Sequence, residues 1–205
     1  MMGTRTAKFW NGFRPFADEI SHFTALPMAQ QCVLFQSIDG YLKQYHPCLH
    51  LHMMGNKVVL SVWRQRTYFP IAEKLVWDVP PDMGVEVEAL VPSGMDRTLY
   101  LECAQGTDVP LDLFGVPVAV SSLYCALEPD GDSPGQFIVT VFHPELYGLT
   151  EAQHFEQLGV LLEAVVGERI YGTYFSQLLL SPIVRNRTAH LIPMYRLVGD
   201  FWWEG

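Results

Sequence analysis

The sequence predicts an α+β protein, and three observations carry this prediction. Apolar residues near the N-terminus recur at spacings of three and four, as on the buried face of a helix. From Pro47 onward apolar and polar residues alternate instead, as in half-buried strands. The order strand, strand, helix, strand then occurs twice, over about residues 47–90 and 118–180. We therefore expect two N-terminal helices followed by two ββαβ units that form a largely antiparallel sheet with helices packed on it.

The two N-terminal helices are predicted from apolar spacing and from prolines. The second helix should begin after Leu26, with Pro27 in its first turn, and end before Pro47. In the first helix we expect Pro15 to lie near the helix start. The apolar face of the first helix comprises Phe9, Trp10, Phe13, Phe16, Ile20 and Phe23.

The first ββαβ unit should open with a hairpin whose turn is Gly55-Asn56. That turn pairs Leu51 with Leu60 and places both on the buried face, together with residues 49, 53, 58 and 62. A helix over 71–79 and a strand over 85–89 complete the unit.

The second unit should contain a longer hairpin, with strands over 118–127 and 137–142. Both of its faces are largely apolar, which predicts a central position in the sheet. Thr150 and Gln153 form a capping box for the next helix, Gly167 ends it, and residues 171–180 form the last strand. Two further short strands are predicted before this hairpin, over 97–103 and 109–116. The apolar tail over 185–205 should pack on the domain or on a partner.

Length and composition favour one domain over residues 1–205. With 49% apolar and only 17% charged residues, the chain can bury a core without disulfides or metals. The four cysteines form no CxxC pair, and we find neither a signal sequence nor a membrane-spanning run, so we expect a cytoplasmic protein. A net charge of −9 disfavours nucleic-acid binding.

Few residues suggest catalysis or metal binding. Cys48, His50 and His52 alternate along a predicted strand and are the best metal ligands in the sequence. They lie opposite the predicted core without a nearby acidic ligand, so we predict no metal and no other cofactor. His143 and His154 are further acid–base candidates. The sequence contains no glycine-rich phosphate loop.

Acidic and aromatic residues instead suggest a surface that binds protein. Acidic side chains gather at Glu86 and Glu88 and again at Asp130 and Asp132, where they would attract a basic partner. The C-terminal pair Trp202 and Trp203 would supply aromatic anchors.

Three stretches together resemble a family of uncharacterised bacterial proteins. These are Phe9-Trp10-Asn11-Gly12-Phe13, the helix Leu161-Leu162-Glu163-Ala164-Val165-Val166-Gly167-Glu168, and Leu178-Leu179-Leu180-Ser181-Pro182. The resemblance implies an FWxxF-type N-terminal helix and two strand-strand-helix-strand units, and it transfers no residue role. In size and acidity the chain is also similar, at the level of class, to immunity proteins encoded beside secreted toxins.

The leading functional hypothesis is therefore a non-catalytic protein-binding protein, in one version an immunity protein that neutralises a basic toxin. One alternative is an enzyme with an active site between the two halves, using His50, His52 or His143. Another is a structural or regulatory homodimer in which the tryptophan-ended tail crosses a symmetric interface.

Overall fold

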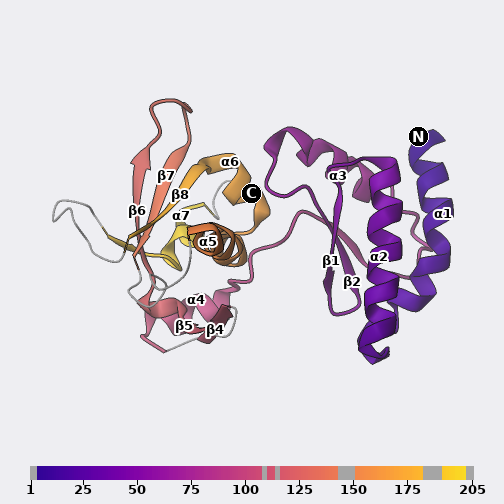
Figure 1. The fold of residues 1–205 in the computed structure, drawn as a ribbon, viewed down its shortest axis with the longest axis horizontal. Helices are drawn as coiled ribbons and strands as arrows, with labels where there is room; N and C mark the ends of the chain where they lie inside the picture. The colour runs from indigo at the N-terminus through magenta and orange to yellow at the C-terminus, as the bar shows by residue number, and fades with distance from the viewer. Residues whose placement is uncertain (1–3, 108–109, 114–115, 143–150, 182–190, 202–205) are drawn as a thin grey trace. The chain divides into compact units, whose positions relative to one another are not determined.

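The computed structural model describes residues 4–107, 110–113, 116–142, 151–181 and 191–201. Residues 1–91 and 92–205 form two compact units, unit 1 and unit 2. Each unit has its own sheet and its own core, so each is described by itself (Figure 1).

Unit 1 combines three helices with a three-stranded sheet in the order β1-β2-β3. Strand β2 pairs antiparallel with β1 and parallel with β3. Leu51 lies opposite Leu60 across the hairpin, which confirms the predicted register. The elements are α1 (Thr4–Ile20), the 3₁₀ turn η1 (Phe23–Ala25), α2 (Met28–Tyr45), β1 (His50–Met54), β2 (Lys57–Ser61), the 3₁₀ turn η2 (Arg66–Tyr68), α3 (Phe69–Trp77) and β3 (Val87–Ala89).

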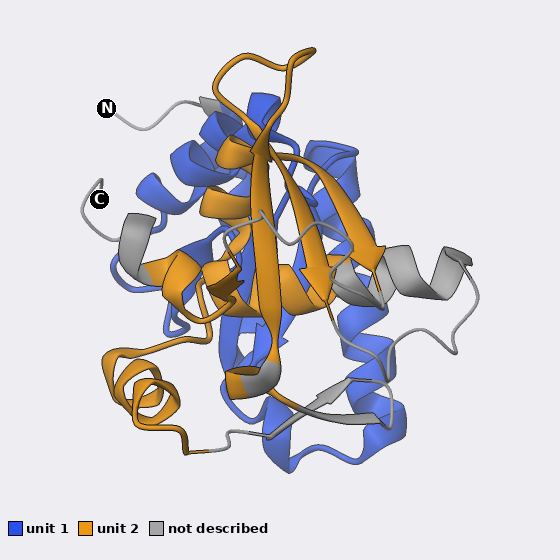
Figure 2. Cartoon of the chain, turned by 90° about the vertical axis from the view of Figure 1, so that its left-hand side faces the viewer, with its two compact units in different colours: residues 1–91 blue, residues 92–205 orange. Residues whose placement is uncertain are grey.

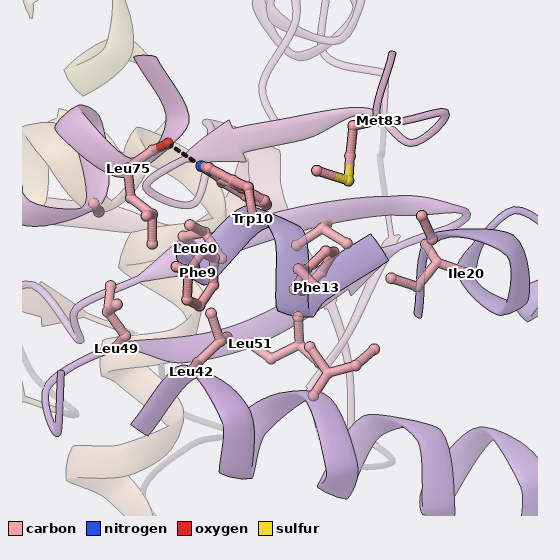
Figure 3. Close-up of a cluster of buried hydrophobic side chains, with 14 of the residues drawn as sticks. Phe9, Trp10, Phe13, Ile20, Leu42, Leu49, Leu51, Leu60, Leu75 and Met83 are labelled. Atoms are coloured by element: carbon pink, nitrogen blue, oxygen red, sulfur yellow. Dashed lines mark hydrogen bonds between the residues drawn. The ribbon is translucent and has the colours of Figure 1, made fainter. Parts of the chain in front are cut away.

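The core of unit 1 lies between these helices and one face of the sheet. Trp10 and Phe13 of α1 are completely buried, as is Leu60 of β2. Their neighbours in the core are shown in Figure 3. The Trp10 indole N–H donates a hydrogen bond to the carbonyl of Leu75 at 3.0 Å. Leu75 lies in the last turn of α3, where carbonyls have no helical donor, so Trp10 completes the end of that helix.

Helix α1 departs from expectation at Pro15, which lies inside the helix and not near its start. Pro15 is exposed, so its ring points away from the packed face. One turn earlier, Gly12 gives α1 room for the hydroxyl of Tyr41 on α2. That hydroxyl donates a hydrogen bond to the Phe9 carbonyl at 2.8 Å, and a Cβ at Gly12 would overlap it.

Unit 2 is built on a four-stranded sheet in the order β8-β7-β6-β9 and also contains the two-stranded sheet β4-β5. In the larger sheet β6 pairs antiparallel with β7 and β9, and β8 pairs parallel with β7. The elements are α4 (Arg97–Ala104), β4 (Pro110–Leu113), β5 (Val116–Ala119), the 3₁₀ turn η3 (Val120–Ser122), β6 (Tyr124–Pro129), β7 (Phe137–Phe142), α5 (Glu151–Val166), α6 (Glu168–Tyr174), β8 (Phe175–Ser181), β9 (Ile192–Pro193) and α7 (Arg196–Phe201).

Three predictions of strand in unit 2 are wrong in whole or in part. Within the predicted strand 118–127, residues 120–122 form the 3₁₀ turn η3. A helix cap or a turn explains the other two. Residues 97–103 form α4, because the Asp96 carboxylate accepts a hydrogen bond from the Leu99 N–H at 2.8 Å and caps the helix. Residues 171–174 belong to α6. Gly167 ends α5 with a left-handed φ of 82°, and the chain turns there directly into α6 before β8 begins.

The α+β class is confirmed, and so is the order of the two ββαβ units. In each unit a hairpin is followed by helix and then by a third strand parallel to the second strand of the hairpin. The sheets are consequently mixed, and the two hairpins lie in separate sheets, in place of the one largely antiparallel sheet that was expected. That residues 1–205 form a single domain stays a prediction.

The C-terminal tail contributes to the core of unit 2, as far as it is described. Met194, Leu197 and Val198 are completely buried and belong to the core cluster that also contains residues of β6, β7 and α5. The predicted capping residue Thr150 and the anchors Trp202 and Trp203 lie outside the described residues. Within the described part of the chain, no helix is long and apolar enough to cross a membrane.

Candidate functional site

The four-stranded sheet of unit 2 has one face packed on the helices and one face turned away from them. Cys125, Val139 and Leu178 point into the core. Residues on the opposite side form what we call the outer sheet face, and no described helix of unit 2 covers it (Figure 2). The cross-strand register places these residues on it: Tyr124, Ala126, Glu128, Ile138, Thr140, Phe142, Gln177 and Leu179.

The outer sheet face is unusually apolar for a surface without a covering helix. Tyr124 is 42% exposed and Leu179 is 48% exposed. Phe142 lies directly opposite Tyr124, and Ile138 is a half-buried residue on the central strand β7. Aromatic and aliphatic side chains gathered in this way mark surfaces where proteins meet. The sequence contains this signal, since both faces of the hairpin are apolar, but the pattern by itself predicts a central strand pair and not an exposed apolar face.

The acidic excess of the chain belongs entirely to unit 2. Residues 1–91 contain eight basic and eight acidic side chains, and residues 92–205 contain five basic and fourteen acidic ones. The whole net charge of −9 is therefore carried by the unit that bears the outer sheet face. On that face Glu128 is exposed, and Asp132 is exposed in the adjoining β6–β7 turn.

Asp130, the third acidic residue of this hairpin, stabilises the β6–β7 turn through its carboxylate. It is only 8% exposed, and its carboxylate accepts a hydrogen bond from the Asp132 N–H at 2.9 Å. Two hydrogen bonds hold the pKa of Asp130 below its usual value. The larger effect comes from the Ser176 hydroxyl and the next from the Asp132 N–H. Asp130 thus shapes the turn that presents Asp132 and has little surface to offer a partner.

Glu86 and Glu88, the other predicted acidic positions, lie beside the hairpin of unit 1. Lys57 contacts both carboxylates, with Nζ–O distances of 2.8 Å to Glu86 and 2.9 Å to Glu88. Hydrogen bonds from Lys57 to the two carboxylates raise its pKa, with the larger effect from Glu86 and the next from Glu88. Lys57 therefore offsets part of the negative charge of both carboxylates, so Glu86 and Glu88 attract a basic partner less strongly.

The candidate metal ligands Cys48, His50 and His52 do not form a metal-binding cluster. The described residues contain no group of three His, Cys, Asp or Glu side chains that could hold a metal ion. Cys48 instead forms a hydrogen bond with the Tyr68 hydroxyl, which raises the pKa of Tyr68. The His50 ring lies 5.0 Å from that of Trp63, centroid to centroid. His52 shares the sheet face of His50 by alternation.

A strained turn places Trp63 beside His50, and the sequence does not predict this turn. Trp63 and Arg64 have φ values of 54° and 66°, in the left-handed region usually occupied by glycine or asparagine. The turn closes through a hydrogen bond from the Gln65 N–H to the Val62 carbonyl at 3.2 Å. Trp63 is 53% exposed, so this turn displays an aromatic side chain at the surface of unit 1.

The catalytic candidates give no assembled site among the described residues. Cys125 is completely buried, and burial raises the pKa of its thiol to about 12, so it stays protonated and unreactive near neutral pH. His143 lies outside the described residues, and the side chain of His154 is likewise not described.

The fold defines the chain as an α+β protein with two ββαβ units, and the outer sheet face of unit 2 is its candidate binding site. No protein-family model, curated protein or solved structure matches the chain. The resemblance to a bacterial family therefore stays a prediction, and the function has to be argued from the surface itself.

Proposed function

We propose that this chain is a non-catalytic protein-binding protein that holds a basic protein on the outer sheet face of unit 2. The observation that supports the proposal most strongly is the coincidence of two properties on one unit. The sheet face exposes Tyr124 and Leu179, and the same unit carries the entire net charge of −9.

These two properties have complementary roles in protein recognition. Desolvation of apolar and aromatic side chains supplies most of the affinity, with hot-spot residues contributing about 2 kcal/mol or more each. Surrounding acidic residues raise the rate of encounter with a basic protein and disfavour acidic competitors. Glu128 and Asp132 stand at one end of the apolar residues, where they would meet basic side chains at the rim of the complex.

In its more specific form the proposal makes the partner a basic toxin and the chain its immunity protein. The acidity and size of the chain support this form, because a neutralising protein must cover a cationic surface with a complementary one. Co-expression with each protein encoded beside this chain tests it. Restored growth of cells that produce a toxic neighbour is the expected result, and continued growth arrest with every toxic neighbour would contradict it.

The binding surface is tested by photo-crosslinking in the cells that make the protein. A photoreactive benzoyl-phenylalanine replaces Tyr124 in one variant and Trp77 in the control variant. Trp77 is a matched control because it is aromatic, 87% exposed and located in unit 1. We expect a discrete adduct with a basic protein from position 124 and none from position 77. The same adducts from both positions, or an acidic protein at position 124, would contradict the proposal.

A further inference from the structure

A pocket lies in unit 1 between the first two turns of α1 and the last turn of α2, which run side by side (Figure 1). We call it the α1–α2 pocket, and its volume is about 330 Å³. Ligand sites in proteins measure roughly 300–1,000 Å³, so this pocket suits a small molecule. It is lined by Arg5, Lys8, Phe9, Tyr41, Gln44 and Tyr45.

The α1–α2 pocket concentrates positive charge. Arg5 and Lys8 stand three residues apart on α1, so their side chains share one face of the helix. The described residues that line the pocket include no carboxylate. Within the described part of the chain, Lys8 forms no hydrogen bond and no ion pair, so its charge is not neutralised there. Two cations therefore meet in one pocket of a chain whose net charge is −9.

The guanidinium group of Arg5 is already held in place at the pocket. It lies over the Tyr45 ring, 4.7 Å from the ring centroid, and donates a hydrogen bond to the Tyr45 carbonyl. Tyr45 is the last residue of α2, where a helix end carries partial negative charge, and Arg5 offsets this charge. A guanidinium group has further N–H donors for an anion. Because Arg5 is positioned in advance, a ligand would lose less affinity to the ordering of this side chain.

Aromatic rings form the other part of the pocket. The Phe9 ring lies 5.1 Å from the Tyr41 ring and 5.0 Å from the Tyr45 ring, between centroids. Phe9 is only 4% exposed, whereas both tyrosines are half-buried and supply accessible ring surface. The hydrogen bond from the Tyr41 hydroxyl to the Phe9 carbonyl fixes the Tyr41 ring. Such a surface favours a ligand that itself contains an aromatic ring.

We propose that the α1–α2 pocket binds a small aromatic phosphate monoester. Its phosphate group contacts Arg5 and Lys8, and its ring packs on Tyr41 and Tyr45. A phosphate monoester carries a charge of about −1.5 to −2 near neutral pH, which matches two cations, and its oxygens suit the forked donors of arginine. This site goes beyond the proposed function and does not depend on it, because it lies in unit 1 and shares no residue with the outer sheet face.

Phenyl phosphate is the probe that tests the proposal, titrated to about 10 mM into the ¹⁵N-labelled full chain and followed by NMR. We expect saturable shifts of the amides of residues 5–9 and 41–45, with a dissociation constant of about 0.1–1 mM for so small a ligand. Inorganic phosphate keeps the charge and lacks the ring, and phenol keeps the ring and lacks the charge. Each should bind at least about 5-fold more weakly. Equal binding of either one would contradict the proposal.

Two lysine variants test the position of the charge. Lys8→Gln should weaken phenyl phosphate binding by about 10-fold, because it removes a charge-assisted contact. Lys43→Gln is the matched control: it changes the net charge equally, but Lys43 pairs with Asp39 and does not line the pocket. This control should bind like the wild type. Lys8 is exposed, so Lys8→Gln should keep its fold, which circular dichroism checks. The absence of saturable shifts, shifts centred outside residues 5–9 and 41–45, or equal affinities of the two variants would each overturn the proposal.

Discussion

The contact between Gly12 and Tyr41 predicts an unusual response to a common stabilising substitution. Gly12 is an exposed glycine inside α1, where replacement by alanine ordinarily stabilises a protein by about 0.5–1 kcal/mol. Here a Cβ would overlap the Tyr41 hydroxyl, which is hydrogen-bonded to the Phe9 carbonyl. We therefore expect Gly12→Ala to destabilise the protein.

The magnitude follows from what Tyr41 loses when it is displaced. Its hydrogen bond to Phe9 contributes about 1 kcal/mol. Its ring stacks on Phe9 at 5.1 Å and contacts Phe16 at 5.8 Å between centroids, and displacement disturbs contacts of about 0.5–1.5 kcal/mol each. Offset by the helix propensity of alanine, the net cost of Gly12→Ala is about 2 kcal/mol, whereas Tyr41→Phe alone costs about 1 kcal/mol.

The two substitutions together separate this explanation from a general weakness of α1. Removal of the hydroxyl relieves most of the overlap, so the double variant should cost about 1 kcal/mol and not the roughly 3 kcal/mol of the added single effects. Urea unfolding followed by circular dichroism gives all four free energies. A stabilising Gly12→Ala, or effects that add within about 0.5 kcal/mol, would refute the proposed contact.

Three further substitutions or treatments test individual features of the structure. Trp10→Phe should lower the free energy of unfolding by about 2–4 kcal/mol because it leaves a buried carbonyl without its donor, whereas the exposed Trp77→Phe should change it by less than about 0.5 kcal/mol in the same urea titration. Ellman's reagent should modify Cys32 rapidly in the native protein and Cys125 only after unfolding, as mass mapping of the labelled thiols will report; early labelling of Cys125 would contradict its burial. The lowered pKa of Asp130 contributes stability above the usual aspartate pKa, and this contribution is lost as pH falls through the lowered pKa, so Asp130→Asn should flatten the acid limb of the stability profile; an unchanged limb would show that the turn does not depend on this carboxylate.

The parts of the fold that were predicted from sequence are those with strong local signals. The turn at Gly55-Asn56 and the alternation around it specify both the hairpin and its register, because a slip by one residue would expose Leu51 and Leu60. Pro27 and the apolar spacing after it locate α2 in the same way.

The errors arose where a cap or tertiary packing overrides residue preference. Residues 97–103 contain alternating apolar side chains, but Asp96 caps them as a helix. Pro15 remains inside α1 because its ring faces solvent, while the buried face of the helix packs through Trp10 and Phe13. Neither effect leaves a periodic pattern in the sequence.

The candidate site was predicted only in outline. The net charge of −9 is visible in the sequence, but its segregation into unit 2 becomes visible only when the unit boundary at residue 91 is known. The sequence could not show that Lys57 contacts Glu86 and Glu88, because β3 pairs with β2 through a crossover. Tyr124 and Leu179 belong to different strands, and only the sheet register brings them to one face.

The affinity of the basic partner for the outer sheet face is the most direct test of the proposed function. The partner recovered from position 124 should be titrated by calorimetry against the wild type, Leu179→Asp and Trp77→Phe. We predict that Leu179→Asp weakens binding by at least about 100-fold, that Trp77→Phe binds like the wild type, and that added salt weakens the wild-type complex. Equal affinity of Leu179→Asp and the wild type would contradict the proposal that this face holds the partner.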